Sequence, residues 1–253
     1  MIYDIQRAGM LRRIPAWLLD IILLITLATG LMAGLAHLLD VDSQLKALDA
    51  IYVKYEKEYG IDFAKTSEEL EAMPEEELAK YEAAATALDK DTEAQATYQL
   101  LLNLTLITLG VGILGAFLIL EFLIPLLLKN GQTLGKKAFG VGLMRKDGIK
   151  VTTFMIFARS ILGKYTIETM VPVLLIVGLI FNTAGGIGLI LLAVSLLAQI
   201  IIPLATRDKT AIHDLMACTV AVELSSQMIF DTVEEQEEYH KRLHEENTAQ
   251  ADE

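Results

Sequence analysis

Apolar and charged positions alternate in long blocks along this chain. Stretches almost free of charge run over residues 14–39, 104–128 and 171–206, and the segments between them are rich in acidic and basic side chains. Three ionisable residues interrupt the apolar stretches: Asp20, His37 and Glu121. Since about 20 consecutive apolar residues in a helix cross the core of a bilayer, the first two stretches each predict one membrane-spanning helix.

The third apolar stretch is too long for one ordinary span. Near its middle the run 182–186, Asn-Thr-Ala-Gly-Gly, places turn-forming residues between two apolar halves. This pattern predicts a hairpin made of a third helix over about 168–181 and a fourth helix that ends near 206. We expect Pro172 in the first turn of the third helix, where its missing N–H has no partner to lose. Because this helix is short for a complete crossing, a tilted or partly re-entrant segment is the alternative.

The overall composition supports the division into blocks. The chain is 53% hydrophobic with a mean hydropathy of +0.45, yet its net charge is -12. Leu, Ile, Ala and Gly dominate the apolar runs, which favours helices packed on helices over the alternating pattern of an outer-membrane barrel. We therefore predict an all-α fold, a polytopic membrane bundle of four transmembrane helices with an external helical hairpin and a small cytoplasmic β element.

Basic residues predict the orientation of these helices. Lysine and arginine gather at the amino terminus, in the connection 129–167 and just after residue 206. Under the positive-inside rule these regions face the cytoplasm, which four spans allow and three do not. The expected segments are a cytoplasmic amino terminus with the first helix (1–39), an acidic extracytoplasmic helical insertion (40–99), the second helix (100–128), a basic cytoplasmic connection (129–167), the transmembrane hairpin (168–206) and a cytoplasmic carboxyl-terminal segment with an acidic tail (207–253).

The acidic insertion has the composition of two helices. Residues 44–59 and 67–87 are rich in Ala, Leu, Glu and Lys, and the runs 66–69 and 73–77 resemble helix starts with acids in the first turn. The acids could bind cations or a basic partner, but the spaced ligands of a calcium loop are lacking, so a solvated face is the favoured interpretation. Five aromatic residues are expected to form its small core: Tyr52, Tyr55, Tyr59, Phe63 and Tyr81.

The basic connection predicts a β element. A glycine-rich turn over 130–137 precedes the segment 141–151, which resembles a hairpin around Asp147-Gly148, and 218–224 alternates enough to pair with it. The turn does not have the spacing of a phosphate-binding loop, because Gly131 and Gly135 are too close together.

Polar side chains inside the apolar stretches are the candidates for function. Asp20, Glu121 and Gln199 lie on three helices, each roughly 10 Å from the cytoplasmic end by helix rise. If their faces converge, they form a polar cluster that can hold a cation or exchange a proton, and ionisable groups in membranes are costly enough to suggest such roles. The alternative is that these side chains only tie helices together through hydrogen bonds.

Asp20 and the pair His213-Asp214 need partners. Arg13 projects from nearly the same helical face as Asp20, but seven residues separate them, which is too far for a reliable ion pair. We expect Arg13 to point toward lipid head groups and Asp20 to find Arg159, His213 or a water instead. For His213-Asp214 an interfacial cap or salt bridge is favoured over a proton relay.

The sequence contains no arrangement typical of a catalytic or cofactor site. Nucleophile-and-base patterns, metal motifs and nucleotide fingerprints are lacking, so we expect no enzyme, no cofactor and no metal site. The single cysteine, Cys218, excludes an intramolecular disulfide, and the acidic balance argues against a nucleic-acid partner.

Three segments resemble the RDD family of prokaryotic membrane proteins over about residues 8–224, apart from the acidic insertion. They are 12–21 (RRIPAWLLDI), 131–137 (GQTLGKK) and 213–219 (HDLMACT). The family is named for one arginine and two aspartates, which the resemblance assigns to Arg13, Asp20 and Asp214. Cys218 stands where the family usually has glycine.

The resemblance implies a multi-pass protein of the prokaryotic cytoplasmic membrane. It also implies transport of an unknown ligand, and some members of the family are linked to sodium and proton exchange. We therefore expect a transporter or cation/proton exchanger with Asp20, Glu121, Gln199 and His213 as candidate ion, proton or ligand residues. Its partners would be the lipid bilayer, a monovalent cation, a proton or a small solute, and a second copy or another membrane protein. The alternative is a non-transporting scaffold that docks a partner protein.

Overall fold

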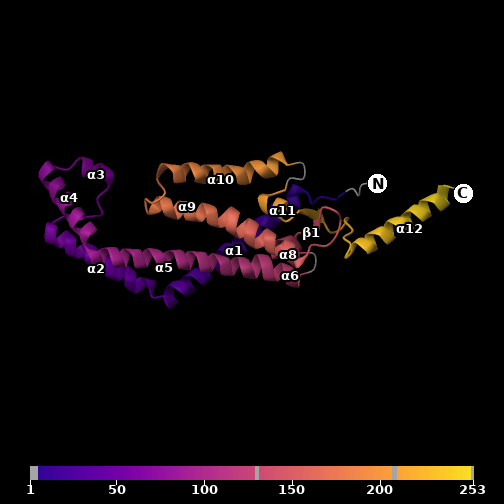
Figure 1. Ribbon diagram of the computed structural model, residues 1–253, viewed down its shortest axis with the longest axis horizontal. Coiled ribbons are helices and arrows are strands. Elements are labelled where there is room, and N and C mark those ends of the chain that lie inside the picture. The colour runs from indigo at the N-terminus through magenta and orange to yellow at the C-terminus, as the bar shows by residue number, and fades with distance from the viewer. Residues whose placement is uncertain (1–4, 129–130, 207–209, 252–253) are drawn as a thin grey trace. The chain divides into compact units, whose positions relative to one another are not determined.

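The computed structural model describes residues 5–128, 131–206 and 210–251 (Figure 1). Within these residues four helices are long and apolar enough to cross a membrane: Met10–Leu38, Thr92–Leu127, Thr153–Ile180 and Gly185–Ala205. This confirms the predicted all-α membrane fold. The chain divides into two compact units, the first made of Met1–Ala28 and Ile113–Glu253 and the second of Thr29–Gly112. Lys129, Arg207 and Lys209, which contributed to the predicted orientation, lie outside the described residues.

The second unit contains the predicted helical insertion. After α1 (Met10–Leu38) the chain forms α2 (Val41–Tyr59), α3 (Ser67–Glu71) and α4 (Glu75–Lys90). Thr66 and Glu69 make a reciprocal capping box at the start of α3, and Pro74 precedes three glutamates in the first turn of α4. The expected aromatic core is confirmed by ring contacts that join Tyr52 to Phe63, Phe63 to Tyr81 and Tyr55 to Tyr59.

The second membrane helix is longer than its apolar stretch. It begins as α5 (Thr92–Phe117), passes through the π-helix η1 (Leu118–Leu123) and ends as α6 (Ile124–Leu127), 36 residues in all. The expected boundary near 100 is therefore wrong, because nothing in 92–99 breaks a helix. Asp91 starts α5 by accepting hydrogen bonds from the backbone N–H groups of Glu93 and Ala94.

The third membrane helix begins well before the predicted residue 168. It consists of α8 (Thr153–Phe157), the π-helix η3 (Ala158–Met170) and α9 (Val171–Ile180), so the last part of the expected basic connection 129–167 is helical. With 28 residues it is long enough for a full crossing. Pro172 lies inside this helix rather than in its first turn.

The missing N–H of Pro172 is compensated from a neighbouring helix. A proline inside a helix removes a bond to the carbonyl four residues earlier. That carbonyl belongs to Glu168, and it accepts a hydrogen bond of 3.0 Å from Nε2 of Gln199 in α10 (Gly185–Ala205). Helices α9 and α10 lie side by side as the predicted hairpin (Figure 1). Asn182 and Gly185 adopt positive φ angles in its turn, as their residue types favour.

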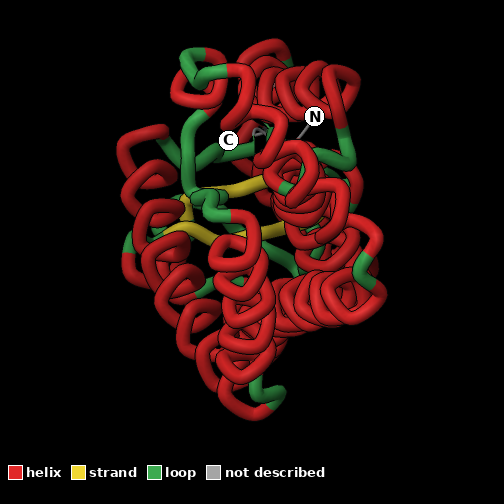
Figure 2. Tube along the Cα trace, turned by 90° about the vertical axis from the view of Figure 1, so that its left-hand side faces the viewer, coloured by secondary structure: helices red, strands yellow, loops and turns green. Residues whose placement is uncertain are grey.

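The small β element forms as predicted. Strand β1 (Val141–Arg145) pairs antiparallel with β2 (Thr219–Glu223), with Val141 opposite Glu223, and both strands are flanked by helices (Figure 2). Met144 and Lys150 form a bridge around the turn at Asp147-Gly148. Two short helices precede the strands: α7 (Leu134–Ala138) leads into β1, and α11 (Ile212–Met216) leads into β2.

Candidate functional site

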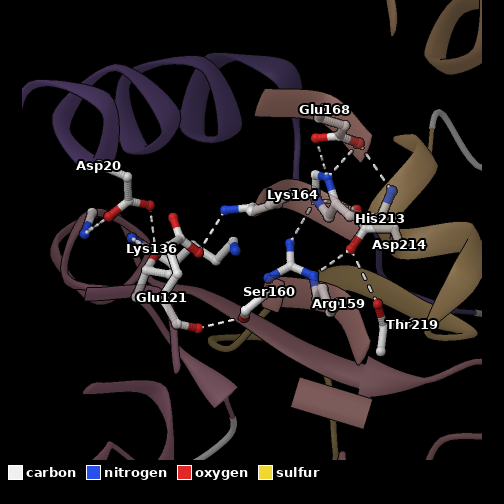
Figure 3. Close-up of polar contacts among 12 residues, drawn as sticks. Asp20, Glu121, Lys136, Arg159, Ser160, Lys164, Glu168, His213, Asp214 and Thr219 are labelled. Atoms are coloured by element: carbon white, nitrogen blue, oxygen red, sulfur yellow. Dashed lines mark hydrogen bonds and ion pairs between the residues drawn. The ribbon is translucent and has the colours of Figure 1, made fainter. Parts of the chain in front are cut away.

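A buried ion pair joins the third membrane helix to α11. Arg159 in η3 donates from Nε to Oδ1 of Asp214 at 2.7 Å, and the side chains are only 4% and 3% exposed. Thr219, the first residue of β2, donates to the same carboxylate oxygen at 3.1 Å (Figure 3). Burial, the largest single influence, would raise the pKa of Asp214, but the nearby groups, foremost the Arg159 guanidinium, together outweigh it and hold this pKa well below its usual range.

His213 lies between Arg159 and Glu168 (Figure 3). Its Nδ1 is 2.8 Å from Oε2 of Glu168, and its backbone N–H donates to Oε1 of the same carboxylate at 3.0 Å. Its Nε2 is 3.0 Å from Nη2 of Arg159. Since a guanidinium can only donate, Nε2 accepts and Nδ1 carries the proton, which describes a neutral imidazole. Burial lowers the pKa of His213 and supports this form.

A glycine allows this close approach. A Cβ at Gly163 in η3 would lie 2.6 Å from the Cβ of His213 and 2.7 Å from its Cα, distances that real side chains do not reach. The absence of a side chain therefore lets α11 rest against the third membrane helix, and the polar contacts of His213 and Asp214 depend on it.

Glu121 makes the second buried ion pair. It lies in η1, and its Oε2 accepts from Nζ of Lys164 in η3 at 2.6 Å. The side chains are 5% and 14% exposed. Ser160 also donates to the backbone carbonyl of Glu121. Two π-helical segments therefore meet at this pair, in keeping with the frequent occurrence of π-helical turns at functional sites.

Asp20 binds the segment that follows the second membrane helix. Its two carboxylate oxygens accept from Oγ1 of Thr133 at 2.5 Å and from the backbone N–H of Gly135 at 2.7 Å. A Cβ at Gly135 would lie 2.1 Å from the carbonyl oxygen of Ala16, so only glycine permits α7 to approach α1 this closely. These partners differ from the expected ones, Arg159 and His213, because the glycine-rich turn brings one hydroxyl and one backbone donor to Asp20.

Lys136 carries a buried ammonium. Its Nζ is shielded from solvent and has no hydrogen-bond acceptor among the described residues. Burial lowers the pKa of Lys136 to about 7, assisted by the nearby charges of Arg159 and Lys164 and opposed by those of Glu121 and Asp214. The amine therefore changes its charge near neutral pH.

A cavity of about 430 Å³ connects these groups. Among the predicted site residues, Arg13, Asp20, Gln199, His213 and Asp214 line it. Glu121 is reached through Lys164, which also lines the cavity. The three residues expected at one level thus lie around one region, but Asp20, Glu121 and Gln199 each bind a different partner instead of one another.

Three residues of this region were not predicted as site residues from the sequence: Lys136, Lys164 and Glu168. Lys136 and Lys164 were used only as markers of orientation, and Glu168 only as the start of the third helix. For Lys164 and Glu168 the usable signal is the pattern of isolated charges between apolar residues over 153–170, which is typical of a membrane helix with a polar interior face. Within the described part of the chain, no group of three or more His, Cys, Asp and Glu side chains is arranged to hold a metal ion.

Comparison with known proteins gives one family. The sequence model described as the RDD family matches residues 7–218, which confirms the resemblance seen in the three segments. No curated protein and no solved structure matches the chain. The assignment of the family's arginine and aspartates to Arg13, Asp20 and Asp214 stays a prediction.

Proposed function

The chain belongs to the RDD family of membrane proteins, and we propose that it is a transporter that exchanges a monovalent cation for a proton across the bilayer. The buried pair of Glu121 and Lys164, beside a cavity in a membrane bundle, is the observation that carries the proposal.

A cation and an ammonium compete for the same carboxylate. Glu121 is tolerable in a membrane helix because Lys164 neutralises it. A cation that reaches Glu121 displaces Lys164, whose ammonium then lies near the charges of Lys136 and Arg159 and releases its proton. One cation enters and one proton leaves, so the net charge of the site is unchanged.

The geometry favours Glu121 over Asp20 as the exchanging carboxylate. Both oxygens of Asp20 accept hydrogen bonds from the segment at Thr133 and Gly135, which α7 needs for its start. We assign Asp20 and Asp214 to the structure of the cavity mouth. Four further polar residues form part of its lining: Arg13, Arg159, Gln199 and His213.

The proposal puts this cavity at the cytoplasmic side of a prokaryotic cytoplasmic membrane. Lysines and arginines gather around α7 and β1, including Lys137, Arg145 and Lys150, and the positive-inside rule assigns such regions to the cytoplasm. Both termini then lie in the cytoplasm and α2 to α4 lie outside. Since four helices make a thin bundle, we propose that two or more copies assemble.

Proteoliposomes with an internal pH-sensitive dye test the exchange. Addition of sodium or potassium outside should drive protons out of vesicles that contain the wild-type protein. Glu121→Gln should abolish this signal, because the cation loses its ligand. Lys164→Arg should keep the ion pair but also abolish exchange, because a guanidinium does not release its proton.

Glu71→Gln, at an exposed position of α3, is the matched control and should exchange normally. The proposal is wrong if wild-type vesicles show no cation-dependent proton movement, or if Glu121→Gln and Lys164→Arg both exchange like the wild type.

A docking role is the second candidate, favoured by the existence of a separate compact unit over Thr29–Gly112 whose helices carry exposed acidic side chains. A partner that co-purifies with the full chain and is lost on deletion of 41–90, while the remaining protein stays monodisperse in detergent, would support it. If the protein without 41–90 still transports, transport and docking are roles of different units.

A further inference from the structure

The buried ammonium of Lys136 lacks a hydrogen-bond acceptor among the described residues that surround it. The neighbouring carboxylates are already engaged. Glu121 accepts from Lys164, Asp214 accepts from Arg159, and the oxygens of Asp20 accept from the segment at 133–135. A buried ammonium without an acceptor is costly, so the site calls for an anionic group from outside this part of the chain.

The walls of the cavity indicate where such a group comes from. Its rim includes Ile14 and Trp17 on α1 and Leu204 on α10, all apolar and 47%, 57% and 74% exposed. These helices are two of the four candidate membrane spans, so their exposed apolar side chains face lipid tails when the protein is in a bilayer. The lining also carries four bases and three acids, so one positive charge is in excess: Arg13, Lys136, Arg159 and Lys164 against Asp20, Glu168 and Asp214. A ligand that fits both surfaces has an anionic head and an apolar tail.

We propose that this cavity binds the phosphate of an anionic phospholipid, attracted by the positive charge of Lys136 in the cavity wall, with the acyl chains lying along α1 and α10. A volume of about 430 Å³ lies within the usual range of ligand sites, roughly 300–1,000 Å³. Lysine binds phosphate as a point charge, and Arg13 on the same wall adds a second positive charge.

Binding of the phosphate is coupled to proton uptake. The groups that face Lys136 are Arg159 and Lys164 from η3, Glu121 from η1 and Asp214 from α11. Burial and the two cations lower the pKa of Lys136 to about 7, and a phosphate bound beside it would raise this pKa again. The lipid should therefore bind more tightly at pH 6, where the amine is charged, than at pH 8.5.

Lipid binding to the purified full-length protein tests this site. Native mass spectrometry in detergent, with phosphatidylglycerol, phosphatidylcholine or inorganic phosphate added at pH 6 and pH 8.5, measures occupancy. Wild type should bind phosphatidylglycerol at least ten-fold more tightly than phosphatidylcholine, since only phosphatidylglycerol carries a net negative charge to match the excess positive charge of the lining. The preference should shrink at pH 8.5.

Two variants and a control make the result specific. Lys136→Met should lose the preference for phosphatidylglycerol, and Lys136→Arg should keep it but lose its pH dependence. Lys137→Met, at the exposed neighbouring position, should behave like the wild type. Elution as a single peak in size-exclusion chromatography shows that each variant is folded.

The proposal fails if Lys136→Met binds phosphatidylglycerol as well as Lys137→Met does. It also fails in its choice of ligand if inorganic phosphate saturates the site and phosphatidylglycerol does not, because the occupant is then a free anion. Neither result depends on whether the protein exchanges cations.

Discussion

The two compact units differ in their charged pairs, because the first unit contains buried pairs beside exposed ones such as Arg145 with Asp147. In the second unit, acids and bases are exposed and pair over short distances along the chain, as in the i,i+4 contact of Glu76 with Lys80, whose side chains are 84% and 53% exposed. In the first unit, the pairs of Arg159 with Asp214 and of Lys164 with Glu121 are nearly buried and join residues 55 and 43 positions apart.

The exposed pairs help to keep a surface solvated, whereas the buried pairs hold the side chains of the site in place. An exposed pair contributes about 0–1 kcal/mol because water screens it. A buried pair costs several kcal/mol if one partner is lost, since the other charge then remains without compensation. Substitutions in the two units should therefore differ strongly in effect.

The largest effect is expected from Arg159→Met. It leaves the carboxylate of Asp214 buried and unpaired and removes a donor to His213, which should cost about 3–5 kcal/mol of unfolding free energy. Thermal unfolding in detergent measures this loss.

The double variant Arg159→Met/Asp214→Leu is the control, because it removes both charges. It should recover most of the stability lost in Arg159→Met. If the double variant is as unstable as the single one, the unpaired carboxylate is not the cause.

A smaller effect is expected from Gly135→Ala. The added methyl group collides with the carbonyl of Ala16 and pushes α7 away from Asp20, which should cost about 1–3 kcal/mol. Gly34→Ala in α1 is the matched control, because a Cβ there meets nothing within 4 Å. Equal melting temperatures for the two variants would show that α7 is not held tightly against α1.

The buried amine of Lys136 should make the unfolding free energy depend on pH. The folded-state pKa of Lys136 is lowered to about 7, whereas the unfolded chain has its ordinary value near 10.4. Between these values the unfolded chain binds more protons, so Lys136 contributes a rise of stability with pH, at most about 1.4 kcal/mol per unit.

Thermal unfolding of lipid-free protein between pH 7.5 and 9.5 measures this slope. Lys136→Met should be more stable than the wild type at pH 7.5, and the difference should shrink as the pH rises. Lys137→Met, changed at the exposed neighbour, should follow the wild type at every pH. A difference between Lys136→Met and wild type that is constant with pH would mean that the amine is not buried.

The smallest effect is expected from Lys80→Ala in the second unit. Removing this exposed partner of Glu76 should change the unfolding free energy by no more than about 0.5 kcal/mol. The same detergent unfolding assay applies. A loss comparable to that of Gly135→Ala would remove the contrast between the two units.

Features encoded by neighbouring residues could be predicted from the sequence alone. The four membrane helices follow from apolar runs, the hairpin of α9 and α10 from Asn182 and Gly185, and the start of α3 from Thr66 and Glu69. The pairing of 141–145 with 219–223 also followed from local alternation, once both segments were expected on the same side of the membrane. Periodicity, turn residues and caps act within a few positions, so they are legible in a single sequence.

Only the tertiary structure decided which charges could be buried. The third membrane helix begins at Thr153 although Arg159, Lys164 and Glu168 interrupt its hydrophobic pattern, because each finds a partner from a distant segment. Asp20 likewise accepts from a hydroxyl and a backbone N–H more than 100 positions away, and no described residue accepts a hydrogen bond from Lys136 Nζ. The free energy of a buried charge depends on what surrounds it in three dimensions, and that environment is assembled from residues whose proximity no local pattern records.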